Sequence, residues 1–497
     1  MLGRTGDVKR LLLVLCVLWS TPSRAAVQFE RWSDALFARA KAEHRYVLLG
    51  LGAVWCHWCH VMEDVTYQDP DVARLIGARF IAVRADQDAD PDLSRRYEDW
   101  GWPATIVFAP DGSEIVKRRG YLPPPQMSAL LAAIIADPSP GPSVVPVVPW
   151  RITAQTQPAP AARAELERTF RAAFDERWAG WGTIHKYLDA EAIEYALATP
   201  RYRDLGYRTL DAGLALIDPV WGGMYQYSDE VDWKSPHYEK IMSVQTGAIE
   251  LYLAARDHDP RYLAAARAIA SYLRDHLTSP EGALYTSQDA DLDAHTPGKQ
   301  FYALDDADRR RLGAPRIDTH IYPRENGWAI TAFARLYAAT HDADWLARAR
   351  RAADWIDAHR LLDDGAYRHG DADRAGPYLG DTLAMAEAQL ALAEVDPSGP
   401  WLTRTLRSAH ALRRFAASAA GFTTAPVSRG AAGVFAAPAT IVEDNLAIAR
   451  LARRLLAATG DHAWRAMDQR AMRYLSSPTL VEVRPFSPGV LLISADR

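Results

Sequence analysis

The sequence contains few cysteines and no strong excess of either charge. Only 3 of its 497 residues are cysteine, so a disulfide framework cannot hold the chain together and a large buried core must do so. It has 57 Lys and Arg against 62 Asp and Glu, a net charge of -5, and no long basic run. A nucleic-acid partner is therefore not expected, because such partners need a concentrated positive surface.

Long apolar runs are also missing beyond the amino end. Nothing there offers the roughly 20 uninterrupted apolar residues of a transmembrane helix, so no membrane partner is expected once the amino-terminal segment is removed. The overall composition, 49% hydrophobic and 24% charged, is typical of globular protein. The length predicts about two to four domains.

The amino end has the pattern of a secretory signal peptide over residues 1–25. Arg4, Lys9 and Arg10 precede an apolar run at residues 11–19, and small and polar residues follow to Ala26. The residue before Cys16 is leucine rather than a small residue, which favours cleavage near Ala25 or Ala26 over a lipid anchor. We therefore expect an exported protein, periplasmic or secreted, that keeps only Cys56 and Cys59.

Strands and helices alternate over residues 27–136. A C-x-x-C pair, Cys56 and Cys59, follows an apolar strand and opens a helix, which predicts a thioredoxin-like α/β domain. The expected elements are a helix at 31–44, a strand at 46–52, the cysteine helix from Trp55, strands at 80–85 and 104–109, a hairpin strand at 114–118 and a closing helix at 126–136.

A proline-rich connector is predicted at residues 137–163, followed by an all-helical domain at 164–497. One helical pattern recurs at 248–263, 329–346, 383–402 and 446–465, each time with an acidic turn and the start of a second helix. About 330 residues allow about six such hairpins, which must stack or close a ring to bury their apolar faces. We expect an α/α toroid, with an open solenoid as the alternative.

The cysteine pair predicts thiol-disulfide chemistry. Cys56 at the helix start would be the nucleophile, and Cys59, one turn later and less exposed, would resolve a mixed disulfide. His57 would stabilise the Cys56 thiolate, and Trp55, His60 and Pro103 complete the expected redox site, Pro103 as a cis-proline beside the disulfide. A zinc site formed by Cys56, Cys59, His57 and His60 is the alternative, but no second ligand pair stands nearby, so we expect no metal and no cofactor.

The string from Trp55 to Glu63, WCHWCHVME, resembles the spermatogenesis-associated thioredoxin-like family and its bacterial relatives. Further matches are Trp102-Pro103 and the strings at 222–228, 236–240, 289–291 and 301–302. The resemblance implies a multidomain protein in which a thioredoxin-like fold precedes an (α/α)6 toroid, similar to N-acylglucosamine 2-epimerases and six-hairpin glycosidases. Thioredoxin has a buried acid six residues before its first cysteine, where this chain has Gly50, so we expect Glu63, His60 or water to move the proton.

Aromatic and acidic residues in the helical half would suit a sugar ligand at the mouth of the toroid. The same residues could instead cap helices or fill the core. The candidates are Trp221, Tyr225, Tyr227, Trp233, His237, Glu239, Asp289, Asp291, Glu325, Asn326, His369 and Asp381.

Three functions follow from the sequence. The favoured one is an exported thiol-disulfide oxidoreductase whose toroid binds or positions a client, so that its partners are protein thiols or disulfides or a redox protein. The second is a carbohydrate-active toroid, an epimerase or a glycosidase, with a regulatory redox domain. The third is a non-catalytic binding scaffold.

Overall fold

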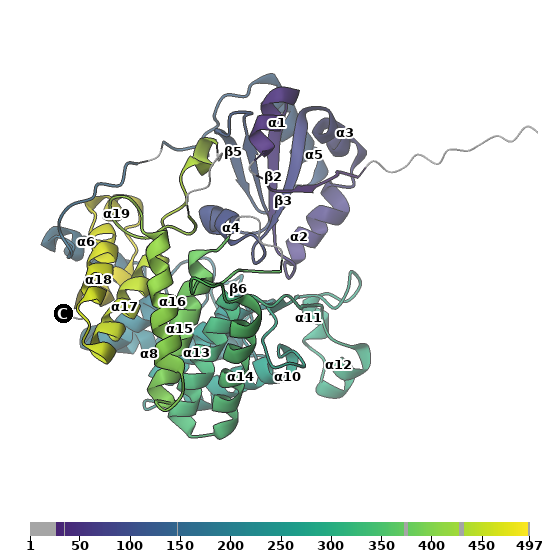
Figure 1. Cartoon of the computed structure of the whole chain (residues 1–497). Helices are drawn as coiled ribbons and strands as arrows, with labels where there is room; N and C mark the ends of the chain where they lie inside the picture. Colours follow the sequence, from purple (N-terminus) through teal and green to yellow (C-terminus); the bar gives the residue numbers. More distant parts are fainter. Residues whose placement is uncertain (1–25, 34, 147, 372–375, 427–431, 496–497) are drawn as a thin grey trace, which may run out of the picture.

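The computed structural model describes residues 26–33, 35–146, 148–371, 376–426 and 432–495. The expected signal peptide at 1–25 lies outside these residues. Figure 1 shows a smaller α/β domain, purple to blue, seated on a larger helical domain, teal to yellow. In the part of the chain that is described, no helix is both long and apolar enough to cross a membrane.

The α/β domain is built on a five-stranded sheet with the order β1-β3-β2-β4-β5. Strands β1, β3 and β2 are parallel, whereas β4 and β5 run antiparallel to their neighbours. The strands are β1 (Glu30–Arg31), β2 (Tyr46–Gly52), β3 (Phe80–Asp86), β4 (Ala104–Phe108) and β5 (Glu114–Arg119). This arrangement confirms the expected thioredoxin-like fold.

Helices cover both faces of this sheet. Helices α3 (Pro70–Arg79) and α5 (Pro124–Ala136) pack on one face, and α1 (Leu36–Glu43) and α4 (Pro91–Tyr97) pack on the other. The helix expected at 31–44 begins later than predicted, because residues 30–31 are extended and pair with β3. The hairpin of β4 and β5 agrees with the predicted one.

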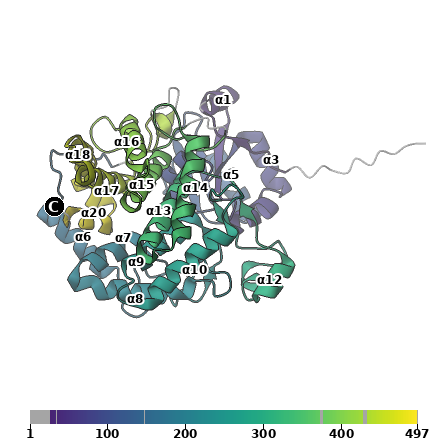
Figure 2. The ribbon, with the colours of Figure 1, turned by 60° about the horizontal axis from the view of Figure 1, so that its bottom comes forward.

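The helical domain is a closed ring. Its inner helices contact one another in chain order, and the last contacts the first, within the part of the chain that the structure describes. They are α7 (Ala190–Ala198), α9 (Met242–Ala254), α13 (Pro323–Thr340), α15 (Leu379–Val395), α17 (Val442–Thr459) and α20 (Pro488–Ala495). Figure 2 shows the helices around the ring. The toroid is thus confirmed over the open solenoid.

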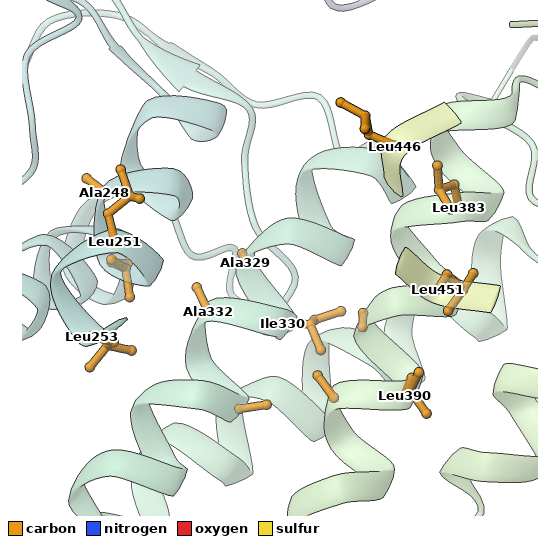
Figure 3. Close-up of a cluster of buried hydrophobic side chains, with 14 of the residues drawn as sticks. Ala248, Leu251, Leu253, Ala329, Ile330, Ala332, Leu383, Leu390, Leu446 and Leu451 are labelled. Atoms are coloured by element: carbon orange, nitrogen blue, oxygen red, sulfur yellow. The ribbon is translucent and has the colours of Figure 1, made fainter. Parts of the chain in front are cut away.

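Each inner helix pairs with an outer one, as the repeated pattern predicts. The outer helices are α8 (Arg203–Gly213), α10 (Pro260–His276), α14 (Ala343–Arg360), α16 (Trp401–Ala411), α18 (Ala463–Leu475) and α6 (Pro160–Ala172), which packs on α20. Leucine, isoleucine and alanine side chains from neighbouring inner helices fill the core, as Figure 3 shows for α9, α13, α15 and α17.

The connector between the domains is shorter than predicted and is attached to both domains. Helix α6 already begins at Pro160, inside the segment 137–163. The backbone N–H of Lys117 donates to Ser143 at the start of the connector. Near its middle, Trp150 stacks on Tyr474 and donates to the Tyr474 carbonyl at 3.0 Å. These contacts fasten the connector to each domain in turn.

The two domains meet at the amino ends of the inner helices. Arg95 on α4 reaches Asp444 on α17 at 3.1 Å, and Arg324 on α13 lies 3.5 Å from Asp88 of the α/β domain. On the α1 and α4 face, Phe435 from the 3-10 turn Gly433–Ala436 packs against the sheet core. The α/β domain therefore covers the end of the ring where the toroid candidates were expected to gather.

Candidate redox site at the domain interface

Cys56 and Cys59 form a disulfide at the start of α2 (His57–Val61). Cys56 caps the helix, and the backbone N–H of Cys59 donates to Cys56 Sγ at 3.2 Å. The helix continues into a π-helical turn, Met62–Thr66. Free N–H groups and the positive end of a helix dipole favour negative charge, so this geometry would stabilise a Cys56 thiolate after reduction.

The Trp102–Pro103 peptide bond is cis, in agreement with the sequence expectation. It immediately precedes β4, which is paired with the strand that leads to the cysteines. The Trp102 ring lies 6.2 Å from that of Trp55 and packs in the same apolar cluster as the disulfide. Trp102 thus forms part of the apolar surroundings of the disulfide.

The disulfide is more enclosed than predicted. Cys56 is 4% exposed and Cys59 is 5% exposed, so the expectation that Cys59 is the less exposed of the two is wrong. Residues outside the thioredoxin-like domain cause this burial: Ile241 and Val244 of the toroid pack in the cluster that contains both cysteines. The toroid therefore covers both sulfur atoms.

Both histidines of the cysteine motif contact acids of the toroid. His57 Nδ1 forms a hydrogen-bonded ion pair with Asp291, and His60 Nδ1 lies 3.5 Å from Asp289 Oδ2. The hydrogen bond with Asp291 raises the pKa of His57 above its usual value, against the opposing effect of burial. Two predicted toroid residues thus belong to the surroundings of the disulfide.

The two acids differ in their ionisation. Burial raises the pKa of Asp289 to about 6. Burial also acts on Asp291, but its hydrogen bonds with His57 and the Gly298 N–H outweigh that effect and lower its pKa. Asp291 therefore keeps its negative charge beside His57, whereas Asp289 holds a proton more readily.

His237 and Glu239 form a neighbouring ion-pair group. His237 Nδ1 lies 3.4 Å from Glu239 Oε2, and its Nε2 lies 2.9 Å from Asp229 Oδ2. The ring of His237 stacks on Tyr227 with a centroid distance of 4.3 Å. Glu239 also contributes to the raised pKa of His57, so the group shares an electrostatic environment with the disulfide.

Trp221 and Tyr225 lie in a separate aromatic cluster with Phe301 and Tyr302. Trp221 Nε1 donates to Asp306 at 2.9 Å, and Tyr225 is 4% exposed. Beneath them Asp218 binds the fully buried Lys240 and Arg309 at 2.8 and 2.7 Å. These contacts make Tyr225 part of the packed interior, whereas Trp221 is only partly buried. Trp233 is buried as well, and its Nε1 donates to the Trp178 carbonyl.

Of the remaining candidates, Glu325, Asn326 and Asp381 lie at the amino ends of α13 and α15, and His369 lies in the loop before α15. Glu325 accepts a hydrogen bond from Arg324, whereas Asn326 donates to the Leu284 and Tyr322 carbonyls as a buried structural group. His369 bridges the domains, with Nδ1 at 3.0 Å from Asp381 and Nε2 at 2.6 Å from the Asp88 carbonyl. The toroid residues predicted as one pocket are therefore divided among several places.

Sequence reasoning missed Asp88, a residue of the thioredoxin-like domain that contacts the toroid through Arg324. Its Oδ2 accepts from Trp55 Nε1 at 3.1 Å, beside Cys56. Asp86 ends β3, and Asp88 and Asp90 follow it, so a run of acids at the carboxyl end of a buried strand was the available signal.

The place of thioredoxin's buried acid is filled by aromatic groups. A side chain at Gly50 would meet the Tyr67 hydroxyl and the Phe29 ring. Glu63, one expected proton acceptor, pairs with Arg84 at 2.8 Å and is about two-fifths exposed. His60, the other, donates from Nε2 to the Val54 carbonyl at 2.9 Å and lies near Asp289. Of the two side chains, His60 lies nearer the interface.

The described residues contain no group of three or more histidine, cysteine, aspartate or glutamate side chains arranged to hold a metal ion. The disulfide engages both cysteines of the zinc alternative. The site that the residues form is therefore a disulfide enclosed by histidines, acids and apolar side chains from two domains.

Comparisons with known proteins agree with this architecture. The family model Thioredox_DsbH, described as "Protein of unknown function, DUF255", matches residues 19–135. Spermatogenesis-associated protein 20 from Mus musculus and from Homo sapiens is 24% identical over 307 residues, which are 53% of this chain and 39% of each relative. The match thus spans about two-fifths of the length of these relatives.

Two further similarities concern one domain each. The thiol:disulfide interchange protein DsbD 2 of Pseudomonas aeruginosa is 42% identical over 89 residues, 17% of this chain and 15% of that protein. The cellobiose 2-epimerase from Bacillus thermoamylovorans superposes with a TM-score of 0.50 at 11% identity, over 63% of this chain and 86% of that one. The resemblance to spermatogenesis-associated thioredoxin-like proteins with an epimerase-like toroid is confirmed.

Proposed function

We propose that this chain is an exported thiol-disulfide oxidoreductase that acts through Cys56 and Cys59. The observation that carries the proposal is the disulfide at the start of α2, with the Cys59 N–H directed at Cys56 Sγ. The similarity of this domain to a thiol:disulfide interchange protein supports it. Partners would be protein thiols or disulfides, or a redox protein that exchanges electrons with the pair.

The reaction consists of two thiol-disulfide exchanges. In the reducing direction, the Cys56 thiolate attacks one sulfur of a client disulfide, forms a mixed disulfide and releases one client thiolate. The Cys59 thiolate then attacks Cys56 Sγ, which releases the second client thiolate and leaves Cys56 and Cys59 oxidised. In the oxidising direction the same steps run backwards, and the client loses two electrons.

The toroid controls access to these sulfur atoms. When a client thiolate attacks the disulfide, its sulfur must approach Cys56 along the line of the sulfur–sulfur bond that breaks. Ile241 and Trp102 pack around that bond. Exchange with a protein client therefore requires the interface to open around Ile241. The toroid in this proposal covers the dithiol between reactions and presents it when a client displaces the contact.

A redox titration of the full-length protein tests the proposal. The protein, freed of residues 1–25, is equilibrated in glutathione buffers and its two thiols are counted by mass spectrometry. We expect one reversible two-electron transition, loss of exchange activity in Cys56→Ser, and trapped mixed disulfide in Cys59→Ser. The absence of a reversible disulfide, or full activity in Cys56→Ser, would overturn the proposal.

Export is tested separately from chemistry. The whole chain, produced in a Gram-negative host, should accumulate in the periplasm with an amino end near residue 26, as the charged and apolar pattern of residues 1–25 predicts. Replacing Leu12 and Leu13 by arginine should keep the protein in the cytoplasm at full length. Retention of residues 1–25 in the exported protein would contradict the predicted cleavage.

A further inference from the structure

A cavity of about 270 Å³ lies between the two domains. Gln87, Asp88 and Trp102 line it from the thioredoxin-like side, and Ser243, Glu325 and Trp328 line it from the toroid side. Of the predicted toroid pocket, Glu325 alone lies in its wall. The cavity is thus a different place from the aromatic cluster of Trp221 and from the ion pair of His237.

Carboxyl groups outnumber guanidinium groups in the wall of this cavity. Arg95 contacts Glu98 at 2.6 Å and Asp444 at 3.1 Å. Arg324 contacts Glu325 at 2.6 Å and Asp88 at 3.5 Å. Two guanidinium groups of the wall therefore face three carboxyl groups of the wall, Asp88, Glu98 and Glu325, and Asp88 and Glu325 are almost fully buried. Buried carboxylates without enough positive charge are unfavourable, so the cavity wall favours a cation or a proton.

Hydrogen-bonding atoms without a partner are found in the same wall. Among the described residues, Glu325 Oε2, Gln87 Oε1 and Trp102 Nε1 are buried and have no hydrogen-bond partner. Two of these atoms accept hydrogen bonds and one donates. Since buried polar atoms in native proteins are normally paired, an occupant with donors for the two oxygens and an acceptor for the indole N–H would satisfy this set.

We propose that the cavity binds a small organic ammonium ion, with its N–H groups directed at Glu325 Oε2 and Gln87 Oε1. The indole rings of Trp102 and Trp328 supply apolar and π surface for the carbon part of such a ligand. A bare metal ion fits the wall less well, because the described residues offer no metal-binding group of three or more side chains. The volume limits the ligand to about the size of an amino sugar or a short diamine.

The ionisation of Asp88 is consistent with a site that lacks positive charge. Burial raises the pKa of Asp88 well above its usual value, and the charges of Asp86 and Glu325 raise it further. A bound ammonium ion would oppose both neighbouring charges and favour the ionised form.

The ligand would contact both domains beside the disulfide. Trp102 belongs to the cavity wall and to the apolar cluster around Cys56 and Cys59. Asp88 accepts from Trp55, the residue before Cys56. An occupant that touches both domains stabilises their docked arrangement, and the disulfide should then be reduced more slowly.

Calorimetry with matched ligand pairs tests the proposal on the oxidised, full-length protein without residues 1–25. Ethanolamine is compared with ethylene glycol, and glucosamine with glucose, at equal ionic strength. We expect the ammonium compound of at least one pair to bind about tenfold more tightly than its neutral partner, because hydrogen bonds to charged groups are the stronger ones. Glu325→Gln and Gln87→Met should each remove most of this preference.

Glu394→Gln serves as the matched control, because Glu394 pairs with Arg454 away from the cavity and is about half exposed. Circular dichroism checks that each variant is folded. Equal binding of ammonium and neutral compounds, preferential binding of glucose, or no binding at all would overturn the proposal. So would unchanged ammonium binding in both cavity variants. Because binding is measured on the oxidised protein without exchange, this result is independent of the redox proposal.

Discussion

Two regions of the domain interface differ in chemistry. On the α1 and α4 face, Phe435 of the toroid packs on Trp32 with centroids 4.5 Å apart and lies under Arg96, whose guanidinium donates to the Val434 and Ala437 carbonyls. At the disulfide, the toroid instead offers Asp289 and Asp291 to His57 and His60. One region is mainly apolar, and the other consists of groups that gain and lose protons.

The difference suggests two roles: the apolar region holds the domains together, and the ionisable region governs access to the disulfide. Aromatic packing is insensitive to pH in the range where histidine titrates, so the Phe435 region can hold the domains together under all conditions in which the protein folds. The contact between His57 and Asp291 responds to pH and lies beside the disulfide. We infer that the disulfide can be uncovered locally while Phe435 keeps the domains attached.

Replacing Phe435 by alanine should have the largest effect. Removing a buried phenylalanine costs about 3–5 kcal/mol, and because this ring is only partly buried we expect a loss of about 2 kcal/mol in the free energy of unfolding. Denaturant titration followed by tryptophan fluorescence measures the loss. Leu402→Ala, at an exposed position on the outer helix α16, is the control and should change stability little. Equal stability of the two variants would remove Phe435 as the anchor.

Replacing Asp291 by asparagine should have a smaller effect, confined to the disulfide region. The ion pair with His57 is about one-third exposed on the histidine side, so solvent screening limits its contribution to about 0.5 kcal/mol. The pKa of His57, measured by NMR on histidine-labelled protein, should fall towards its usual value of about 6.5. Because about 0.5 kcal/mol corresponds to a roughly twofold change in how often the contact opens, Cys56 in the reduced protein should be alkylated about twofold faster.

Asp293→Asn is the matched control for Asp291→Asn. Asp293 lies two residues further along the same loop and binds groups of that loop, the backbone N–H groups of His295 and Thr296 and the Thr296 side chain. An equal shift of the His57 pKa in both variants would show that loop integrity, rather than the ion pair, sets it.

The pH dependence should distinguish the two regions in the unmodified protein. The pKa of His57 is raised, so its contribution to docking is complete below its usual pKa and is lost as the pH rises through the raised value. The pKa of Asp291 is lowered, so its contribution is present above its usual pKa and is lost as the pH falls through the lowered value. The ion pair therefore acts in the window between these two values.

Hydrogen exchange, corrected for its intrinsic pH dependence, can measure this effect. Amides of α2 should become less protected as the pH rises above the window, whereas amides near Phe435 should keep their protection. Asp291→Asn should abolish the difference between the two regions. Loss of protection in both regions together would show that the domains separate as one unit.

Local sequence patterns predicted the elements but not the interface. The strand before Cys56, the helix after it and the repeated helical pairs are each visible in spacing and periodicity, because those properties belong to a single stretch of chain. The His57 and Asp291 pair joins residues 234 positions apart. Nothing in either stretch specifies the other. The burial of Cys56 likewise depends on distant toroid residues, Ile241 and Val244.

Phe435 shows the same limit. It lies in a four-residue 3-10 turn, too short for any periodicity to reveal which face is buried. The Asp289 to Asp291 string was recognised as a candidate, but its partners are histidines of the other domain rather than a sugar-binding aromatic group. The residue types were therefore predictable, whereas their partners required the arrangement of the two domains.

Glu63→Gln should have the smallest effect and sharpens the contrast between contacts within a domain and contacts across the interface. Glu63 and Arg84 form an ion pair with both side chains about two-fifths exposed, so its loss should change the free energy of unfolding by less than about 0.5 kcal/mol. The rate at which Cys59 resolves a mixed disulfide with glutathione, measured by stopped-flow after rapid mixing, should also stay unchanged.

His60→Gln, in which the imidazole near Asp289 is lost, should slow that step because it removes a proton acceptor one residue from Cys59. If Glu63→Gln slows resolution and His60→Gln does not, the acceptor belongs to the thioredoxin-like surface, and the toroid contact at Asp289 has no part in the exchange.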